Sequence, residues 1–163
     1  VGANLKLIRS SISDASGTSA AVDAGAQALH VAEAGDGPID VGGGVSNLGP
    51  PIKVGGSSAA LPLHMRAGLL WHTTPAVSSA LDLNLPVDQD PYVAFGREGV
   101  LKQRSWKGSL RMGYNLGRSR DIEGLTGITG GAGLDVGRLR LDYAWVPFGD
   151  LGVTNRISLA FRF

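Results

Sequence analysis

Residues 139–163, LRLDYAWVPFGDLGVTNRISLAFRF, contain two runs in which apolar and polar side chains alternate. In the last nine residues the apolar side chains occupy every second position: Ile157, Leu159, Phe161 and Phe163. Polar or small side chains lie between them, and the first run has the same spacing. A period of two is typical of a β-strand, because successive side chains of a strand point to opposite faces of the sheet.

The same alternation recurs along the rest of the chain. Three further segments show it clearly: residues 61–71, 79–87 and 106–116. Weaker segments, richer in glycine and alanine, fill most of the remainder: residues 1–8, 20–31, 39–47, 92–101 and 125–136. The sequence therefore predicts one all-β domain over residues 1–163, an antiparallel up-and-down meander of about ten strands.

The composition excludes several classes of protein. Of the 163 residues, 43% are apolar and 18% are charged, so the chain is not a disordered, charge-rich tail. Its 25 glycines follow no Gly-X-Y period, which excludes collagen. The 15 basic and 14 acidic residues nearly balance, so no overall field favours nucleic acid or anionic lipid as a partner. Because the chain has no cysteine, disulfides and thiolate metal sites are excluded.

The lengths of the clearest segments favour a membrane β-barrel. The longest apolar stretch, residues 67–71, is too short for a membrane-spanning helix, which needs about 20 residues. The clearest predicted strands have nine to eleven residues, the length with which a tilted strand crosses a bilayer. We therefore predict a transmembrane β-barrel, with a soluble sheet that has one solvated face as the alternative.

The polar sides of the predicted strands carry charges of both signs near the middle of the strand. In a barrel these side chains would face the lumen and pair across strands. The predicted lumen network consists of Lys6, Asp23, His64, Arg66, Asp82, Glu98, Arg111, Asp135, Arg140, Asp142, Arg156 and Arg162.

The lengths of the connections support the same fold. Short predicted links at residues 72–76, 103–105 and 137–138 alternate with longer ones at residues 10–19, 47–60 and 117–124. Membrane barrels alternate short periplasmic turns and longer outer loops in this way.

Aromatic residues lie near the ends of the predicted strands. Four of them would form two girdles at the membrane surfaces: Trp71, Tyr92, Trp106 and Trp145. The final apolar positions are similar to the C-terminal signal that the outer-membrane barrel insertion machinery reads: Ile157, Leu159, Phe161 and Phe163. The prediction is thus a protein of the outer membrane of a diderm bacterium, with the lipid bilayer and that machinery as partners.

No motif indicates a cofactor or a metal. The glycine-rich residues 40–45 and 127–133 precede no Gly-Lys-Ser/Thr and open no predicted helix, so they differ from phosphate-binding loops. The three histidines lie on different segments without the spacing of metal ligands: His30, His64 and His72. We expect His64 to join the lumen network with Arg66.

No pattern indicates catalysis either. The pairs Asp82/Glu98 and Asp135/Asp142 could form acid–base dyads, but the many arginines make ion pairing the expected state. The serines, including Ser78, lack the context of a nucleophile elbow. We therefore predict a non-enzymatic protein with no catalytic, cofactor or metal site.

Several segments together resemble one family. They are VGANLKLI, VDAGAQAL, VSNLGPPIKV, LPLHMRAGLLW, ALDLNLPVD, SLRMGYN and the final LRLDYAWVPFGDLGVTNRISLAFRF. In this order they resemble the PorV/PorQ-type outer-membrane proteins, relatives of the FadL-like channels for hydrophobic compounds. The most specific parts are residues 142–144 and 147–152, with residues 47–49 as a second marker. Residues 96–99, GREG, depart from the family pattern, which has a small residue before the glutamate and an aromatic after it.

The resemblance implies a barrel of about fourteen strands, of which this chain would be the C-terminal two-thirds, without the first strands. It also implies a role in type IX secretion, in which the barrel accepts secreted cargo at the outer membrane and delivers it for surface attachment. Residues 47–60, 117–124 and 147–154 would then be candidate contacts for cargo and other secretion proteins. The alternatives are passive transport of hydrophobic compounds, a structural barrel within a larger assembly, and a soluble β-sandwich binding module.

Overall fold

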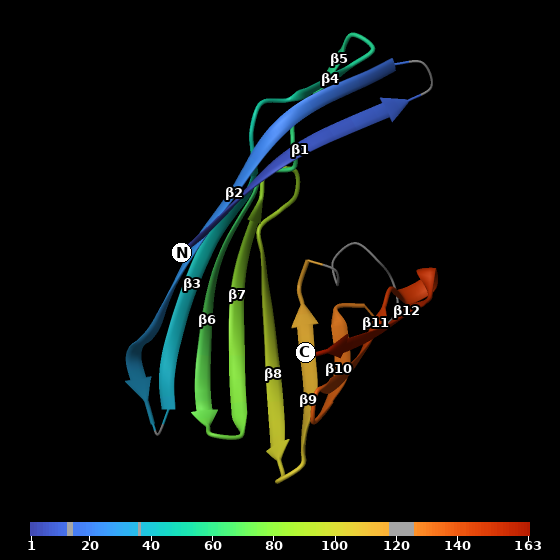
Figure 1. Ribbon diagram of the computed structural model, residues 1–163. Coiled ribbons are helices and arrows are strands. Elements are labelled where there is room, and N and C mark those ends of the chain that lie inside the picture. Colours follow the sequence, from blue (N-terminus) through green and yellow to red (C-terminus); the bar gives the residue numbers. More distant parts are fainter. Residues whose placement is uncertain (13–14, 36, 118–125) are drawn as a thin grey trace.

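The computed structural model describes residues 1–12, 15–35, 37–117 and 126–163 (Figure 1). Its main feature is an antiparallel sheet of ten strands, each paired with the next strand of the sheet along the chain. These strands are β1 (Gly2–Ile12), β2 (Ala15–Ala34), β3 (Gly37–Leu48), β6 (His64–Thr74), β7 (Val77–Pro86), β8 (Tyr92–Lys102), β9 (Trp106–Asn115), β10 (Ile128–Val136), β11 (Leu139–Pro147) and β12 (Val153–Phe161). The predicted all-β meander of ten antiparallel strands is confirmed.

The sheet is open. β1 and β12 each pair with a single neighbour and form its two edges. Figure 1 shows the sheet bent across its width, with β10–β12 turned relative to β6–β8. The described strands therefore give the antiparallel meander of the predicted barrel but do not close it.

Alternating side chains give the sheet one apolar face and one polar face. Residues paired across antiparallel strands share a face, so the register aligns apolar side chains in rows. One row crosses six strands and contains Val41, Leu69, Leu81, Phe95, Tyr114 and Ile128. In the middle of this row, Leu81 and Phe95 are 50% and 53% exposed. The apolar face is thus uncovered even at the centre of the sheet.

The tight connections lie together at one end of the strands. We call this side of the sheet the tight-turn edge; it runs across the ends of the strands and is distinct from the edge strands β1 and β12. Residues 75–76 join β6 to β7, residues 103–105 join β8 to β9, and residues 137–138 join β10 to β11. Gly137 has φ +58°, a conformation that two-residue hairpin turns require and that glycine adopts without strain. The links predicted at 103–105 and 137–138 are confirmed, and the β6–β7 link is shorter than predicted because β6 continues to Thr74.

The prediction of a loop over residues 10–19 is wrong. β1 and β2 continue through most of this segment as a paired hairpin, in which Ile8 lies opposite Ser19 and Arg9 opposite Thr18. The strand was missed because the residues here are mainly serine, threonine and glycine, whose side chains provide no alternation in hydropathy. We call this part of the hairpin, residues 8–12 and 15–21, the hairpin extension.

The predicted loop at residues 47–60 contains a second hairpin, formed by β4 (Ile52–Val54) and β5 (Ser57–Ala59). β4 packs against the hairpin extension, as the upper part of Figure 1 shows. Ser19 Oγ donates a 2.7 Å hydrogen bond to the Pro50 carbonyl oxygen. A Cβ atom on Gly49 would overlap the Ala20 carbonyl oxygen, so this close approach requires glycine. The buried hydrophobic cluster of the described residues is here: Ala21, Ile52 and Leu61.

The predicted loop at residues 147–154 lies at the edge opposite the tight turns, whereas most of the predicted loop at residues 117–124 lies outside the described residues. Only Gly117 of residues 117–124 belongs to the described part of the chain. Residues 147–154 include the 3₁₀ turn η1 (Gly149–Leu151), which is closed by a 2.8 Å hydrogen bond from Phe148 N–H to the Gly152 carbonyl oxygen. Among the described residues, no helix has the length and apolar character needed to cross a membrane.

Candidate functional site: the charged face of the sheet

The polar face carries ionisable side chains on most of its strands. In the described structure they form three clusters linked by ion pairs and hydrogen bonds. The first lies on β8–β11, the second on β1–β3, and the third on β3, β6 and β7. These clusters occupy the face that the sequence assigns to a lumen.

The cluster on β8–β11 is centred on Arg111. Its guanidinium lies 3.0 Å from Glu98 Oε1 and 2.9 Å from Asp142 Oδ1. Arg140 Nε completes the cluster at 2.6 Å from Asp142 Oδ2. Glu98 and Arg111 are directly opposite each other on β8 and β9. The side chains are 28–37% exposed, so the cluster is accessible to solvent or ligand.

Glycine on the intervening strand makes this cluster possible. Asp142 is on β11, two strands away from Arg111, and β10 lies between them. At this level β10 presents Gly131 opposite Arg111 and Gly133 opposite Asp142. A Cβ atom on Gly133 would lie 2.7 Å from Asp142 Oδ1 and 3.3 Å from Arg111 Nη1. Any side chain at this position would therefore crowd the ion pair that spans β10.

The cluster on β1–β3 joins Lys6 to the end of β3. Lys6 Nζ lies 2.6 Å from Asp23 Oδ2 and donates a 3.0 Å hydrogen bond to Asn47 Oδ1. Asn47 has φ +60° and its backbone N–H donates to Asp23 Oδ1 at 2.8 Å. Asparagine tolerates this left-handed conformation better than most residues. Sequence reasoning missed the contribution of Asn47, although residues 47–49 are one of the markers of the resemblance.

The third cluster links β3, β6 and β7 through His72. His72 Nε2 lies 3.1 Å from Asp40 Oδ2, and His72 Nδ1 lies 3.1 Å from Ser78 Oγ. Asp40 Oδ1 also accepts a 2.8 Å hydrogen bond from the backbone N–H of His30, which has φ +54°. The predicted network did not include this cluster.

Regular alternation places the three side chains of this cluster on the polar face. Trp71 pairs with Ser79 on the apolar face, so the adjacent His72 and Ser78 lie on the polar face, and Asp40 pairs with Leu70, two residues from His72. Irregular pairing adds the backbone of His30, because the β2–β3 register shifts between Ala28 and Ala32. The alternation is therefore consistent with the side chains of this cluster, whereas the contribution of His30 could not be predicted from it.

The order Ser78–His72–Asp40 is also that of a hydrolytic triad, but the backbone around it is different. Ser78 lies within the paired part of β7, opposite Glu98 on β8, and not on a sharp strand-to-helix turn. Backbone N–H groups of a paired strand point along the sheet toward its neighbours, whereas acyl transfer needs N–H donors directed at an oxyanion. We therefore interpret the cluster as a structural one, in which side-chain hydrogen bonds connect three strands.

The remaining residues of the predicted lumen network are less connected. Arg162 lies 3.8 Å from Asp135 and is 70% exposed. Arg66, Asp82 and Arg156 form no ion pair with the described residues. His64 Nε2 is buried without a hydrogen-bond partner in the described structure, and no hydrogen bond joins it to Arg66 there.

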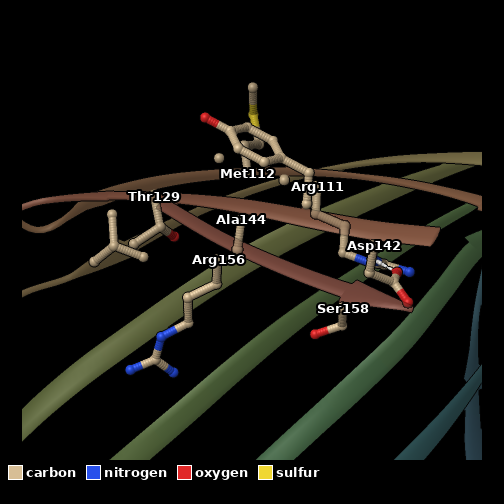
Figure 2. A pocket seen from close by; sticks show the side chains of 11 residues that line it. Arg111, Met112, Thr129, Asp142, Ala144, Arg156 and Ser158 are labelled. Atoms are coloured by element: carbon tan, nitrogen blue, oxygen red, sulfur yellow. Dashed lines mark hydrogen bonds and ion pairs between the residues drawn. The ribbon is translucent and has the colours of Figure 1, made fainter. Parts of the chain in front are cut away.

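A hollow of about 420 Å³ lies beside the Arg111 cluster. The register row Arg111–Gly131–Ala144–Arg156 places two small residues between two arginines. Figure 2 shows Arg156, Ser158 and Asp142 on one side of the strands and Met112 on the other. No group of three or more metal-ligating side chains occurs among the described residues.

Three of the four predicted girdle aromatics share the apolar face. Trp71 and Trp106 lie near the tight-turn edge, where they pair with Ile39 and Val136. Trp145 lies near the opposite edge, and its ring covers Gly130 on the neighbouring strand. Tyr92 is also at that opposite edge, but it pairs with Asn84 and belongs to the polar face.

Three of the four predicted signal residues at the C-terminus lie on the apolar side of β12, and Phe163 follows the end of this strand. Ile157 and Leu159 pair with Tyr143 and Leu141. The exposures of Ile157, Leu159, Phe161 and Phe163 are 74%, 70%, 57% and 106%.

No protein-family model, curated protein or solved structure that was compared with this chain matches it.

Proposed function

We propose that this chain forms part of the wall of an outer-membrane β-barrel, with its apolar face against lipid and its charged face toward a lumen. The observation that carries this proposal is the uncovered apolar face, which continues across the sheet in register. A soluble sheet normally buries such a face against a second layer. Lipid provides the equivalent cover for a membrane barrel.

The hairpin extension supports a membrane boundary at one end of this face. Leu5 and Leu7 of β1 lie on the apolar face, opposite Val22 and Ala20. Two residues after Leu7, Arg9 lies on the same face of β1. From this point the apolar contacts move to the other side, where Ile8 packs against the buried cluster of the β4–β5 hairpin. In the extension, the side that continues the apolar face is therefore polar, and the apolar side chains of the other side are covered by the β4–β5 hairpin, as expected for a structure in water.

The open edges require further pairing in a bilayer. Unpaired backbone groups are very costly in lipid, so a membrane sheet has to close. In an antiparallel meander of ten strands the first and last strands run in opposite directions. Antiparallel closure therefore needs either direct pairing of β1 with β12 or an even number of additional strands between them.

Within this proposal the protein is non-enzymatic and takes part in type IX secretion, as the resemblance to PorV/PorQ-type proteins implies. Residues 47–60 and 147–154 lie at the edge opposite the tight turns and are candidate contacts for cargo. Passive transport of hydrophobic compounds is the second candidate. It has less support because ion pairs line the charged face.

The barrel proposal is tested by folding the chain in detergent micelles and phospholipid vesicles. A folded barrel should migrate faster on gels before boiling than after boiling, and its circular dichroism should show β-structure. A folded monomer that remains in the aqueous phase without detergent would contradict the proposal.

The two roles are separated by their ligands. A secretion component should co-purify from detergent extracts with proteins that carry a C-terminal secretion domain. A transporter should instead accelerate the entry of a hydrophobic dye or fatty acid into vesicles. Transport without cargo binding would reject the secretion role.

A further inference from the structure

Arg97 is an exception to the separation of apolar and charged side chains in the sheet. It lies on β8 directly between Ser79 of β7 and Met112 of β9. The same row contains Trp71 and Trp145 of the apolar face. Outside the hairpin extension, no other aspartate, glutamate, lysine or arginine on the described strands of the ten-stranded sheet lies on this face. A cation therefore interrupts the surface that the proposed barrel turns toward lipid.

Arg97 is at the centre of its strand. β8 extends from Tyr92 to Lys102, so each end of the strand is five residues from Arg97. With a rise of about 3.3 Å per residue and a strand tilt of about 40°, each end is about 13 Å away along the membrane normal. An arginine side chain is shorter than this distance, so the guanidinium lies within the hydrocarbon of the proposed barrel's bilayer. Arginine on the lipid face is most unfavourable at this depth.

The described protein does not neutralise Arg97. Its side chain is exposed and forms neither an ion pair nor a hydrogen bond with the described residues. By contrast, Arg111 on the neighbouring strand is paired with Glu98 and Asp142 on the polar face. Ionisable side chains inside a membrane are rare and are almost always paired. In the proposed barrel, the opposite charge for Arg97 therefore has to come from another molecule.

The surroundings of Arg97 suit close approach by a second protein. Ser79 lies beside it, and a Cβ atom on Gly99, two residues further along β8, would meet no other atom within 4 Å. Small residues allow neighbouring segments to approach closely within a membrane. On the β9 side is Met112, which is 68% exposed and points away from Arg156 (Figure 2). Its flexible side chain can adapt to the shape of a partner. We call Ser79, Arg97, Gly99 and Met112 the Arg97 patch.

Charge and depth select the kind of partner. A second copy of this chain would bring no carboxylate from its described strands, because these carboxylates lie on the polar face, as Glu98 does. The phosphate of a lipid lies at the level of the headgroups, beyond the reach of Arg97. A membrane protein with a carboxylate on its own lipid-facing surface provides the charge at the right depth. Opposite charges attract strongly there, because no water screens them.

We propose that the Arg97 patch is a docking site within the membrane for a second membrane protein, which pairs an aspartate or glutamate side chain with Arg97. This inference rests on the proposed barrel. The charge of Arg97 selects the partner, the small residues Ser79 and Gly99 allow its backbone to come close, and Met112 fills the remaining space.

The first test measures whether Arg97 is unpaired in the isolated protein. The full chain is refolded into phosphatidylcholine vesicles, and urea titration gives the ratio of folded to unfolded protein. Arg97→Leu should raise this ratio at least about tenfold, because it removes an arginine from the bilayer midplane. The matched variant Arg156→Leu removes an arginine from the polar face and should not raise it. An unchanged or lower ratio for Arg97→Leu would show that Arg97 already has a partner, such as a lipid phosphate, and would overturn the inference.

The second test supplies a carboxylate within the membrane. The probes are two dansyl-labelled transmembrane peptides of leucine and alanine that differ only in a central glutamate or glutamine. Energy transfer from the tryptophans of the apolar face measures their binding to the chain in the same vesicles. The glutamate peptide should bind at least about fivefold more tightly than the glutamine peptide. This difference should disappear in Arg97→Leu and persist in Arg156→Leu. Equal binding of the two peptides to the wild-type chain would overturn the acidic partner.

Different outcomes address the barrel and the docking site separately. If the wild-type chain fails to insert into phosphatidylcholine vesicles, as judged by its unboiled migration, the barrel proposal is overturned. Normal insertion without a gain in stability for Arg97→Leu would overturn the docking site alone. Self-association of the wild-type chain that is lost in Arg97→Leu would assign the patch to a second copy and would also overturn this inference.

Discussion

The hairpin extension and the β6–β12 part of the sheet differ in which of their faces is covered. In β6–β12 the apolar side chains form an uncovered face and the charged side chains form the other. In the extension this polarity is reversed: Ile8 and Ala21 meet the β4–β5 hairpin, whereas Arg9 and Thr18 are on the side that continues the apolar face. In the proposed barrel this difference corresponds to two surroundings for one continuous sheet, with lipid against β6–β12 and water around the extension.

The largest expected effect comes from placing a charge on the apolar face. Leu81→Arg should lower the free energy of unfolding in vesicles by about 2–4 kcal/mol, because arginine near the bilayer midplane is strongly disfavoured. Urea titration followed by tryptophan fluorescence measures this change. The matched variant Thr18→Arg places the same residue on the corresponding side of the extension and should change stability by less than about 0.5 kcal/mol. Equal losses in the two variants would remove the distinction between the regions.

The next effect tests the contact that covers the extension. Gly49→Ala should lower the free energy of unfolding by about 1–3 kcal/mol, because the new methyl group overlaps the backbone at Ala20. Gly99→Ala on β8 is the control, since a Cβ atom there meets no other atom within 4 Å. An unchanged stability for Gly49→Ala would show that the β4–β5 hairpin is not packed on the extension.

A smaller effect is expected on the charged face of β8–β11. Gly133→Ala crowds Asp142 Oδ1 and Ser109 Oγ, which are the ends of side chains that can move. The free energy of unfolding should therefore fall by only about 1 kcal/mol. The loss should shrink in the background Asp142→Asn, because the ion pair that spans β10 is then already weakened. Full additivity of the two substitutions would contradict a role for Gly133 in making room for that pair.

The smallest effect concerns the cluster of Ser78, His72 and Asp40. Because we interpret this cluster as side-chain hydrogen bonds that connect strands, and not as an activated nucleophile, a fluorophosphonate probe should not label the folded protein at Ser78. Mass spectrometry of the treated protein checks this, with Ser78→Ala as the comparison. Labelling that disappears in Ser78→Ala would identify an activated serine and contradict the non-enzymatic role.

The sequence was sufficient to predict β6, β7, β9, β11 and β12, because the two faces of these strands differ strongly in hydropathy. The end of the chain illustrates this: alternation from Ile157 to Phe161 places these residues on the apolar side of β12. The same reasoning failed for the hairpin extension. There, small residues such as Ser10 and Gly17 pair across the hairpin without a hydropathy signal, and a second layer of structure lies against it.

The candidate site was predicted in part for a related reason. Alternation correctly places Glu98, Arg111 and Asp142 on one face, and the structure joins them through the space over Gly133. In the His72 cluster, alternation also places Asp40, His72 and Ser78 on one face. The backbone contact of His30 depends on a shift in the β2–β3 register, about which a pattern with a strict period of two contains no information.

The most direct test of the central claim compares neighbouring residues of one strand. Because the chain has no cysteine, single cysteines can be placed at Ala80, Leu81, Asp82 and Leu83 of β7 without other changes. In vesicles, cysteines at Leu81 and Leu83 should resist a water-soluble maleimide, and fluorophores attached there after denaturation and refolding should be quenched by lipid-borne quenchers. Cysteines at Ala80 and Asp82 should react with the maleimide. Uniform reactivity along the four positions would contradict a lipid-facing sheet.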